Sequence, residues 1–101
     1  FRSVILEFHP AARDEFLAAA EYYETAVPGL GGRFLVAVTR ATDIVLQHPD
    51  VGGRRGARAR QLSVTGFPYD VVYIVHDDVV STLAVAHHHR RPGYWRDRLN
   101  G

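Results

Sequence analysis

Residues 60–98 read RQLSVTGFPYDVVYIVHDDVVSTLAVAHHHRRPGYWRDR. Residues 60–64 alternate polar and apolar side chains, and residues 69–76 are rich in Val, Ile and Tyr, as buried strands are. Residues 79–87 repeat this composition after the pair Asp77-Asp78. The stretch therefore predicts three consecutive strands, of which the last two form a hairpin.

The first half of the chain supplies elements that can cover these strands. Residues 3–9 alternate as a strand does, and residues 11–26 and 30–47 carry apolar side chains at the three- and four-residue spacing of amphipathic helices. Residues 50–59, DVGGRRGARA, predict an exposed, flexible basic loop. The order β-α-α-β-β-β indicates an α+β fold with a helical hairpin packed on a small, mainly antiparallel sheet. We expect one domain over residues 1–101.

The second predicted helix has more than one apolar surface. One stripe at helical spacing consists of Leu30, Phe34, Ala37, Ala41 and Ile44. A second apolar surface consists of Leu35, Val38, Thr42, Val45 and Leu46. A helix buried from two sides would show this pattern, and the first helix or a partner could supply the second side.

The composition narrows the class of protein. There is no Cys, so disulfides and thiolate chemistry are excluded, and secretion has no support. No apolar run approaches the roughly 20 residues that span a bilayer. Arg2 and Glu7 interrupt the first apolar residues, so these do not read as a signal peptide. We expect a cytoplasmic protein without a membrane partner.

The charges are unevenly distributed along the chain. Residues 1–50 carry four Arg against seven acidic residues, whereas residues 51–101 carry eight Arg against four Asp. All twelve basic side chains are Arg, which binds phosphates and carboxylates in a planar, two-point geometry. A GC-rich genome would also replace Lys by Arg, so the Arg usage alone does not identify a function.

Two groups of Arg stand out as candidate binding sites. The first consists of Arg54, Arg55, Arg58 and Arg60. The second consists of Arg90, Arg91, Arg96 and Arg98, interleaved with Tyr94 and Trp95. If the strands pair as expected, Arg60 and Arg90 approach each other at one end or face of the sheet. Arg beside exposed aromatic rings suits RNA, through phosphate contacts and base stacking. Alternatively, Trp95 anchors the C-terminal segment in the core.

A spaced pattern runs through the same half of the chain. An Arg seven residues before F-P-Y is followed by V-V-Y, a D-D turn and L-A-V-A-H-x-x-R-x-P-x-Y-W-x-x-R. The residues of this pattern are Arg60, Phe67, Pro68, Tyr69, Tyr73, His87, Arg90, Pro92, Tyr94, Trp95 and Arg98. In order and spacing, the pattern resembles the RelE/ParE toxin superfamily of bacterial type II toxin–antitoxin systems. The resemblance covers nearly the whole chain and implies the compact α+β fold of that superfamily.

The resemblance implies one set of roles if the chain is a RelE-type toxin, which cleaves mRNA on the ribosome through attack of a ribose 2′-hydroxyl on the adjacent phosphate. Arg60 and Arg90 would stabilise the phosphate. Proton transfer would fall to Tyr94 or to a histidine of the run His87-His88-His89. The other target contacts would come from Arg54, Arg55, Arg58, Arg91, Trp95 and Arg98.

ParE-type members of the superfamily poison DNA gyrase without such a catalytic centre, and in that reading the Arg residues make protein contacts. We favour this interpretation, because the basic loop has no Lys and the net charge of +1 attracts ribosomal RNA only weakly. A third interpretation is an inactive module that retains only antitoxin binding. The two active readings imply a cognate protein antitoxin that neutralises the basic half, and a target that is either DNA gyrase or the ribosome with mRNA.

The histidine run also raises the question of a metal site. His87 and His89 would point to the same side of an extended chain. No Cys or carboxylate at a familiar spacing completes a ligand set. The sequence therefore predicts neither a metal nor another cofactor.

Overall fold

The computed structural model describes residues 4–100, which form seven helices and strands and a short 3-10 helix. These are β1 (Ile5–Phe8), α1 (Pro10–Ala26), α2 (Leu30–Gln47), β2 (Gly53–Arg55), β3 (Ala59–Ser63), β4 (Tyr69–His76), β5 (Val79–His87) and η1 (Arg96–Asn100). No helix within residues 4–100 is long and apolar enough to cross a membrane.

The five strands form one sheet in the order β1-β5-β4-β3-β2. β1 runs parallel to β5, and every other neighbouring pair is antiparallel. The predicted fold class is confirmed. Two details differ: β2 forms inside the segment predicted as a flexible loop, and the predicted strand over residues 3–9 is shorter, with Ser3 outside the described residues.

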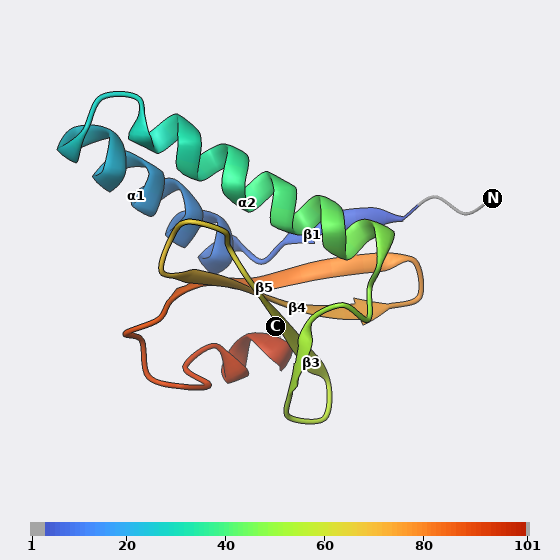
Figure 1. Cartoon of the computed structure of the whole chain (residues 1–101). Coiled ribbons are helices and arrows are strands. Elements are labelled where there is room, and N and C mark those ends of the chain that lie inside the picture. The colour runs from blue at the N-terminus through green and yellow to red at the C-terminus, as the bar shows by residue number, and fades with distance from the viewer. Residues whose placement is uncertain (1–3, 101) are drawn as a thin grey trace.

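The two helices form an antiparallel pair that covers one face of the sheet (Figure 1). Gly31 permits their close approach, because a Cβ atom there would lie 2.5 Å from the carbonyl oxygen of Ala20. The Glu24 carboxylate of α1 accepts hydrogen bonds from the backbone N–H groups of Gly29 and Gly31, at 2.9 and 3.1 Å. Glu24 therefore satisfies free N–H groups at the start of α2 from the neighbouring helix.

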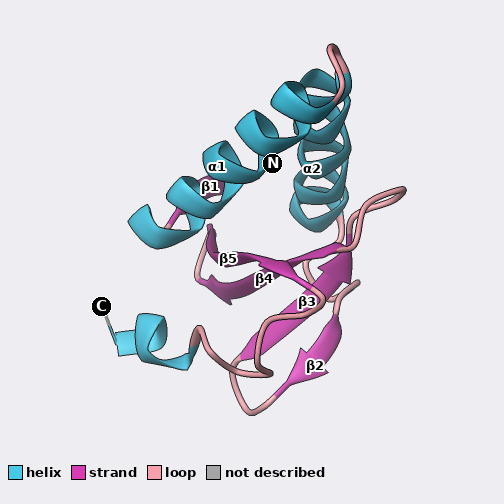
Figure 2. Ribbon diagram, turned by 90° about the vertical axis from the view of Figure 1, so that its left-hand side faces the viewer, coloured by secondary structure: helices cyan, strands magenta, loops and turns pink. Residues whose placement is uncertain are grey.

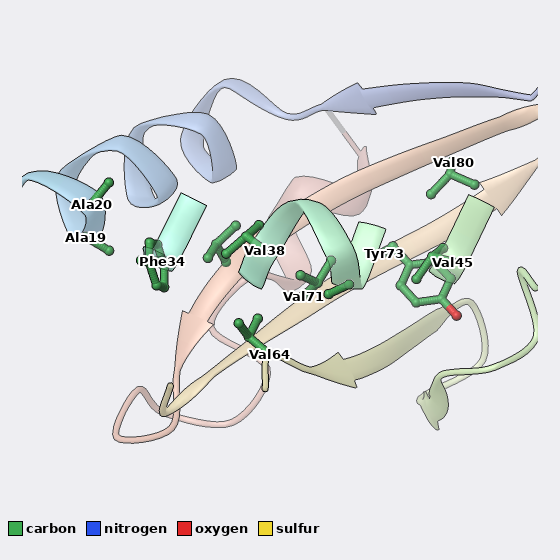
Figure 3. Packing of buried hydrophobic residues seen from close by; sticks show 11 residues of the cluster. Ala19, Ala20, Phe34, Val38, Val45, Val64, Val71, Tyr73 and Val80 are labelled. Carbon is green, nitrogen blue, oxygen red and sulfur yellow. The ribbon is translucent and has the colours of Figure 1, made fainter. Parts of the chain in front are cut away.

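The main core lies between the helices and the sheet (Figure 3). Its largest fully buried side chains include Phe34 and Val38 of α2 and Tyr73 of β4. The buried face of α2 differs from the predicted stripe, because Val45 is buried and Ile44 is 44% exposed. The helix is rotated so that part of each predicted apolar surface faces the sheet and part faces solvent.

A smaller core lies on the opposite face of the sheet, where the C-terminal segment packs (Figure 2). Trp95 is 4% exposed there and contacts a cluster that includes Val72 of β4 and Leu83 and Ala84 of β5. A register shift pairs Val72 with Ala84 and Tyr73 with Thr82, which leaves Leu83 without a partner on β4. This irregularity lets the consecutive residues Leu83 and Ala84 both face the smaller core.

Candidate functional site

A cluster of polar side chains around Glu15 of α1 holds the C-terminal segment. The two nitrogens Nη1 and Nη2 of Arg98 donate to Oε1 and Oε2 of Glu15 at 2.9 and 3.0 Å. The Tyr94 hydroxyl donates to Oε2 at 2.7 Å, and the backbone N–H of Val85 donates to Oε1 at 3.1 Å. The side chains of Glu15 and Arg98 are 16% and 14% exposed. We call Glu15, Tyr94 and Arg98 the Glu15 cluster. Its largely buried carboxylate accepts four hydrogen bonds, of which three come from Tyr94 and Arg98 and one from the backbone of Val85.

The environment of Tyr94 fixes its protonation state. Burial raises the pKa of the Tyr94 hydroxyl above its ordinary value of 10.0, and the hydrogen bond to Glu15 and the negative charge of Glu15 raise it further. The positive charges of Arg90 and Arg98 lower this pKa by less than the other effects raise it. Tyr94 is therefore protonated at neutral pH, and its proton is directed at Glu15. This arrangement is unfavourable for a general base, which is one of the proton-transfer roles that the nuclease interpretation leaves open for Tyr94.

Arg90 lies at the border of the Glu15 cluster. Its guanidinium carbon is 3.8 Å from the centroid of the Tyr94 ring, and its Nη1 is 3.9 Å from Oε2 of Glu15. The Arg90 side chain is 54% exposed. Stacking on Tyr94 orients the guanidinium and leaves much of it accessible to an anion.

Arg60 is engaged by the segment that follows α2. Its Nη1 donates to the carbonyl oxygens of Asp50 and Gly52, at 3.1 and 2.9 Å, and its Nη2 is 3.8 Å from the Asp50 carboxylate. Through its hydrogen bonds to these two carbonyl groups, Arg60 holds the loop after α2 against the sheet.

Arg60 and Arg90 do not come together. Arg60 pairs with Tyr73 on β4, whereas His87 at the end of β5 pairs with Tyr69, four residues or about 13 Å along the strand. Arg60 lines a cleft of about 190 Å³ that includes Tyr73, and Arg90 lines clefts at the other end of β4. The expected approach of Arg60 to Arg90 is wrong, because the strand register separates them.

The three consecutive histidines do not form one site: His87 and His89 contact each other, whereas His88 faces Asp70. The His87 ring packs edge-to-face on Tyr69 with the centroids 5.0 Å apart, and its Nδ1 accepts a hydrogen bond from the backbone N–H of His89 at 3.0 Å. Nε2 of His88 lies 3.1 Å from Oδ1 of Asp70. Within residues 4–100, no group of three or more His, Cys, Asp or Glu side chains gathers as metal ligands do.

The two groups of Arg do meet, through residues other than Arg60. They line a cleft of about 340 Å³ between the β2–β3 hairpin and the segment after β5. We call this the basic cleft; its arginines are Arg54, Arg55, Arg90, Arg91 and Arg96. Arg58 lies in the neighbouring cleft with Arg60, and Arg98 belongs to the Glu15 cluster.

Trp95 also borders the basic cleft, but it is only 4% exposed and has no free face for base stacking. The structure therefore supports the interpretation that Trp95 anchors the C-terminal segment in the core.

The model of a protein family described as ParE toxin of type II toxin-antitoxin system, parDE, matches residues 6–92. The chain belongs to this family. It is also similar in fold to a chain from a solved structure of the chromosomal ParDE TA system from P. aeruginosa, with a TM-score of 0.71 and 15% sequence identity. That match covers 83% of this chain and 95% of the other. Comparison with curated proteins gave no match.

Sequence reasoning missed two acidic residues that organise this candidate site. Glu15 is interpretable from sequence only as a favourable charge near the start of a helix. Asp70 is 8% exposed, and its Oδ2 accepts a hydrogen bond from Nε2 of Gln61 at 2.6 Å. A signal for Asp70 was present, because a carboxylate inside a Val- and Tyr-rich strand needs buried partners.

Proposed function

We propose that this chain is the toxin of a toxin–antitoxin pair and that it inhibits bacterial growth by acting on DNA gyrase. The family match over residues 6–92 supports the toxin assignment. The observation that carries the choice of target is the position of Tyr94, whose hydroxyl donates to Glu15 at 2.7 Å. Together with the separation of Arg60 from Arg90, it leaves the four side chains named for RNA cleavage only partly assembled.

A specific observation keeps mRNA cleavage as the second candidate. His87, Arg90 and Tyr94 line one cleft of about 290 Å³. A phosphate placed there would lie beside a guanidinium and an imidazole, which are two of the groups that 2′-hydroxyl attack requires. His87 would then take the role of general base, since Tyr94 is held protonated.

The proposed partner is a protein antitoxin. The excess of Arg over Asp in residues 51–101 favours contacts with carboxylates of the antitoxin. The exposed apolar side chains of α2, among them Leu35, Val36 and Ile44, offer a second kind of contact. Binding at either surface would be compatible with a segment that wraps the toxin.

The test is the supercoiling activity of purified gyrase with and without the toxin. We expect loss of supercoiling and accumulation of cleaved DNA linked to gyrase. Unchanged supercoiling and unchanged cleavage would overturn gyrase as the target. Cleavage of mRNA on toxin-treated ribosomes would then support the second candidate, and harmless expression without antitoxin would leave only an antitoxin-binding module.

A further inference from the structure

Four of the five arginines of the basic cleft form no ion pair with any of residues 4–100, and the fifth, Arg90, has only the 3.9 Å contact with the Glu15 carboxylate. Arg54 and Arg55 donate only to backbone carbonyl groups, those of Ala57 and Arg54, and neither Arg91 nor Arg96 forms an ion pair with any of residues 4–100. In contrast, Arg98 forms a two-point ion pair with Glu15. The basic cleft therefore concentrates positive potential at one place on the surface.

One carboxylate lines the basic cleft, and its oxygens already have partners. Asp70 accepts a hydrogen bond from Gln61 through Oδ2 and lies 3.1 Å from His88 through Oδ1. It is 8% exposed at the base of the cleft. Asp70 therefore positions polar side chains of the cleft and does not pair with its arginines.

The two walls of the basic cleft come from segments that the fold holds side by side (Figure 2). Arg54 and Arg55 lie on β2, an edge strand paired only with β3. On the other wall, the Arg96 guanidinium packs against Gly93, where a Cβ atom would lie 2.8 Å from Cζ of Arg96. Gly93 also has φ +75°, which favours glycine. The absence of a side chain at Gly93 therefore leaves the space that the Arg96 guanidinium occupies.

The surface around these arginines suits phosphates better than a protein segment. Protein interfaces have an apolar centre, but none of the large, exposed apolar side chains within residues 4–100 lines the basic cleft. Those of α2, such as Leu35 and Ile44, lie on the helical layer. A nucleic-acid backbone needs no apolar contact, because Arg binds phosphates by charge and hydrogen bonds.

We propose that the basic cleft binds one strand of a nucleic-acid backbone through its phosphates. With Trp95 buried and Tyr94 held by Glu15, the cleft has no free aromatic ring for base stacking, so the affinity comes from phosphate contacts, which carry no sequence information. This inference goes beyond the proposed action on gyrase and does not require it, since the cleft would bind nucleic acid without gyrase.

The experiment is a fluorescence anisotropy titration of the full chain with short labelled oligonucleotides, without gyrase. Single-stranded DNA, RNA of the same sequence, duplex DNA and a Glu-rich peptide of matched charge are compared. The test variant combines Arg55→Gln and Arg91→Gln, one exposed arginine from each wall. The control variant combines Arg13→Gln and Arg40→Gln, which remove the same charge from exposed positions of the helices.

We expect the test variant to bind single strands about tenfold more weakly, and the control variant to stay within about twofold of the unsubstituted chain. The slope of log K against log salt should fall in magnitude by about 1.4 in the test variant, since each phosphate contact to a single strand contributes about 0.7. Tighter binding of single-stranded DNA or of the RNA of the same sequence identifies which of the two nucleic acids the cleft prefers. Absence of nucleic-acid binding at low salt, equal losses in both variants, or tighter binding of the Glu-rich peptide would each overturn the proposal. The gyrase assay is separate, so either proposal can fail without the other.

Discussion

Glu15 and Arg98 are 83 positions apart in the sequence and form a two-point ion pair, with N–O distances of 2.9 and 3.0 Å. The pair joins the first turns of α1 to the C-terminal 3-10 helix. Tyr94 donates to the same carboxylate, and Trp95 beside it fills the smaller core. Glu15 therefore fixes the segment that carries one wall of the basic cleft.

Replacing Glu15 should destabilise the protein strongly. In Glu15→Ala, Arg98 is left largely buried without its carboxylate, and the Tyr94 hydroxyl loses its acceptor. We expect a loss of about 3 kcal/mol in the free energy of unfolding. Urea unfolding followed by circular dichroism measures it. Glu21→Ala, at an exposed position of the same helix, should change the unfolding free energy by no more than about 0.5 kcal/mol. Similar losses in the two variants would show that the ion pair adds nothing.

Stability should fall as the pH rises above 10. The pKa values of Tyr23, Tyr69 and Tyr94 are raised above 10.0, chiefly by burial. The folded chain therefore holds these protons more tightly than the unfolded chain, so the stabilisation is complete below pH 10 and is lost as the pH rises toward the folded pKa values. The chain has no Lys and no Cys, so tyrosines dominate titration in this window.

Tyr94→Phe provides the matched measurement for this pH dependence. We expect the drop in unfolding free energy between pH 9 and pH 11 to be smaller in Tyr94→Phe than in the unsubstituted chain, although the variant is less stable at pH 9. An unchanged drop would mean that Tyr94 contributes nothing to the alkaline loss of stability.

Two adjacent glycines of α2 should respond oppositely to substitution. In Gly31→Ala the new methyl group would lie 2.5 Å from the carbonyl oxygen of Ala20, and we expect a loss of about 1–3 kcal/mol as the helices separate. In Gly32→Ala nothing lies within 4 Å of the methyl group, and we expect a gain of up to about 1 kcal/mol from helix propensity. Thermal or urea unfolding of both variants tests the close approach of the helices; equal effects would contradict it.

Tyr94→Phe should retain growth inhibition at equal soluble protein levels. The hydroxyl donates to Glu15 and is held protonated, so its removal affects stability more than activity. Growth curves after induction, normalised by the amount of soluble toxin, measure the effect. A loss of inhibition of about a hundredfold or more, with the fold intact, is the result expected of a proton-transfer residue and would favour mRNA cleavage.

The larger elements were predictable because their patterns are local. Alternation and β-branched composition predicted β4 and β5, and the Asp77-Asp78 pair predicted their hairpin, where Asp77 has φ 54°. β2 was not predictable in this way. Its sequence, Gly53-Arg54-Arg55, has no strand composition, and it is a strand through backbone pairing with β3.

The candidate site depended on contacts that local patterns do not encode. Nothing in the sequence distinguishes Glu15 from its neighbour Asp14, because only the folded chain brings Arg98 to one of them. The meeting of Arg54 and Arg55 with Arg90 required the extra strand that the sequence did not predict. The spacing of the family pattern predicted the family, which the match over residues 6–92 confirms.

The most direct test of the proposed function is induced expression without antitoxin, followed by measurement of gyrase–DNA cleavage complexes and of mRNA ends in the same cells. We expect cleavage complexes to accumulate while mRNA stays intact. New mRNA ends in codon register, without an increase in cleavage complexes, would contradict the gyrase assignment and identify the His87 and Arg90 cleft as a catalytic site.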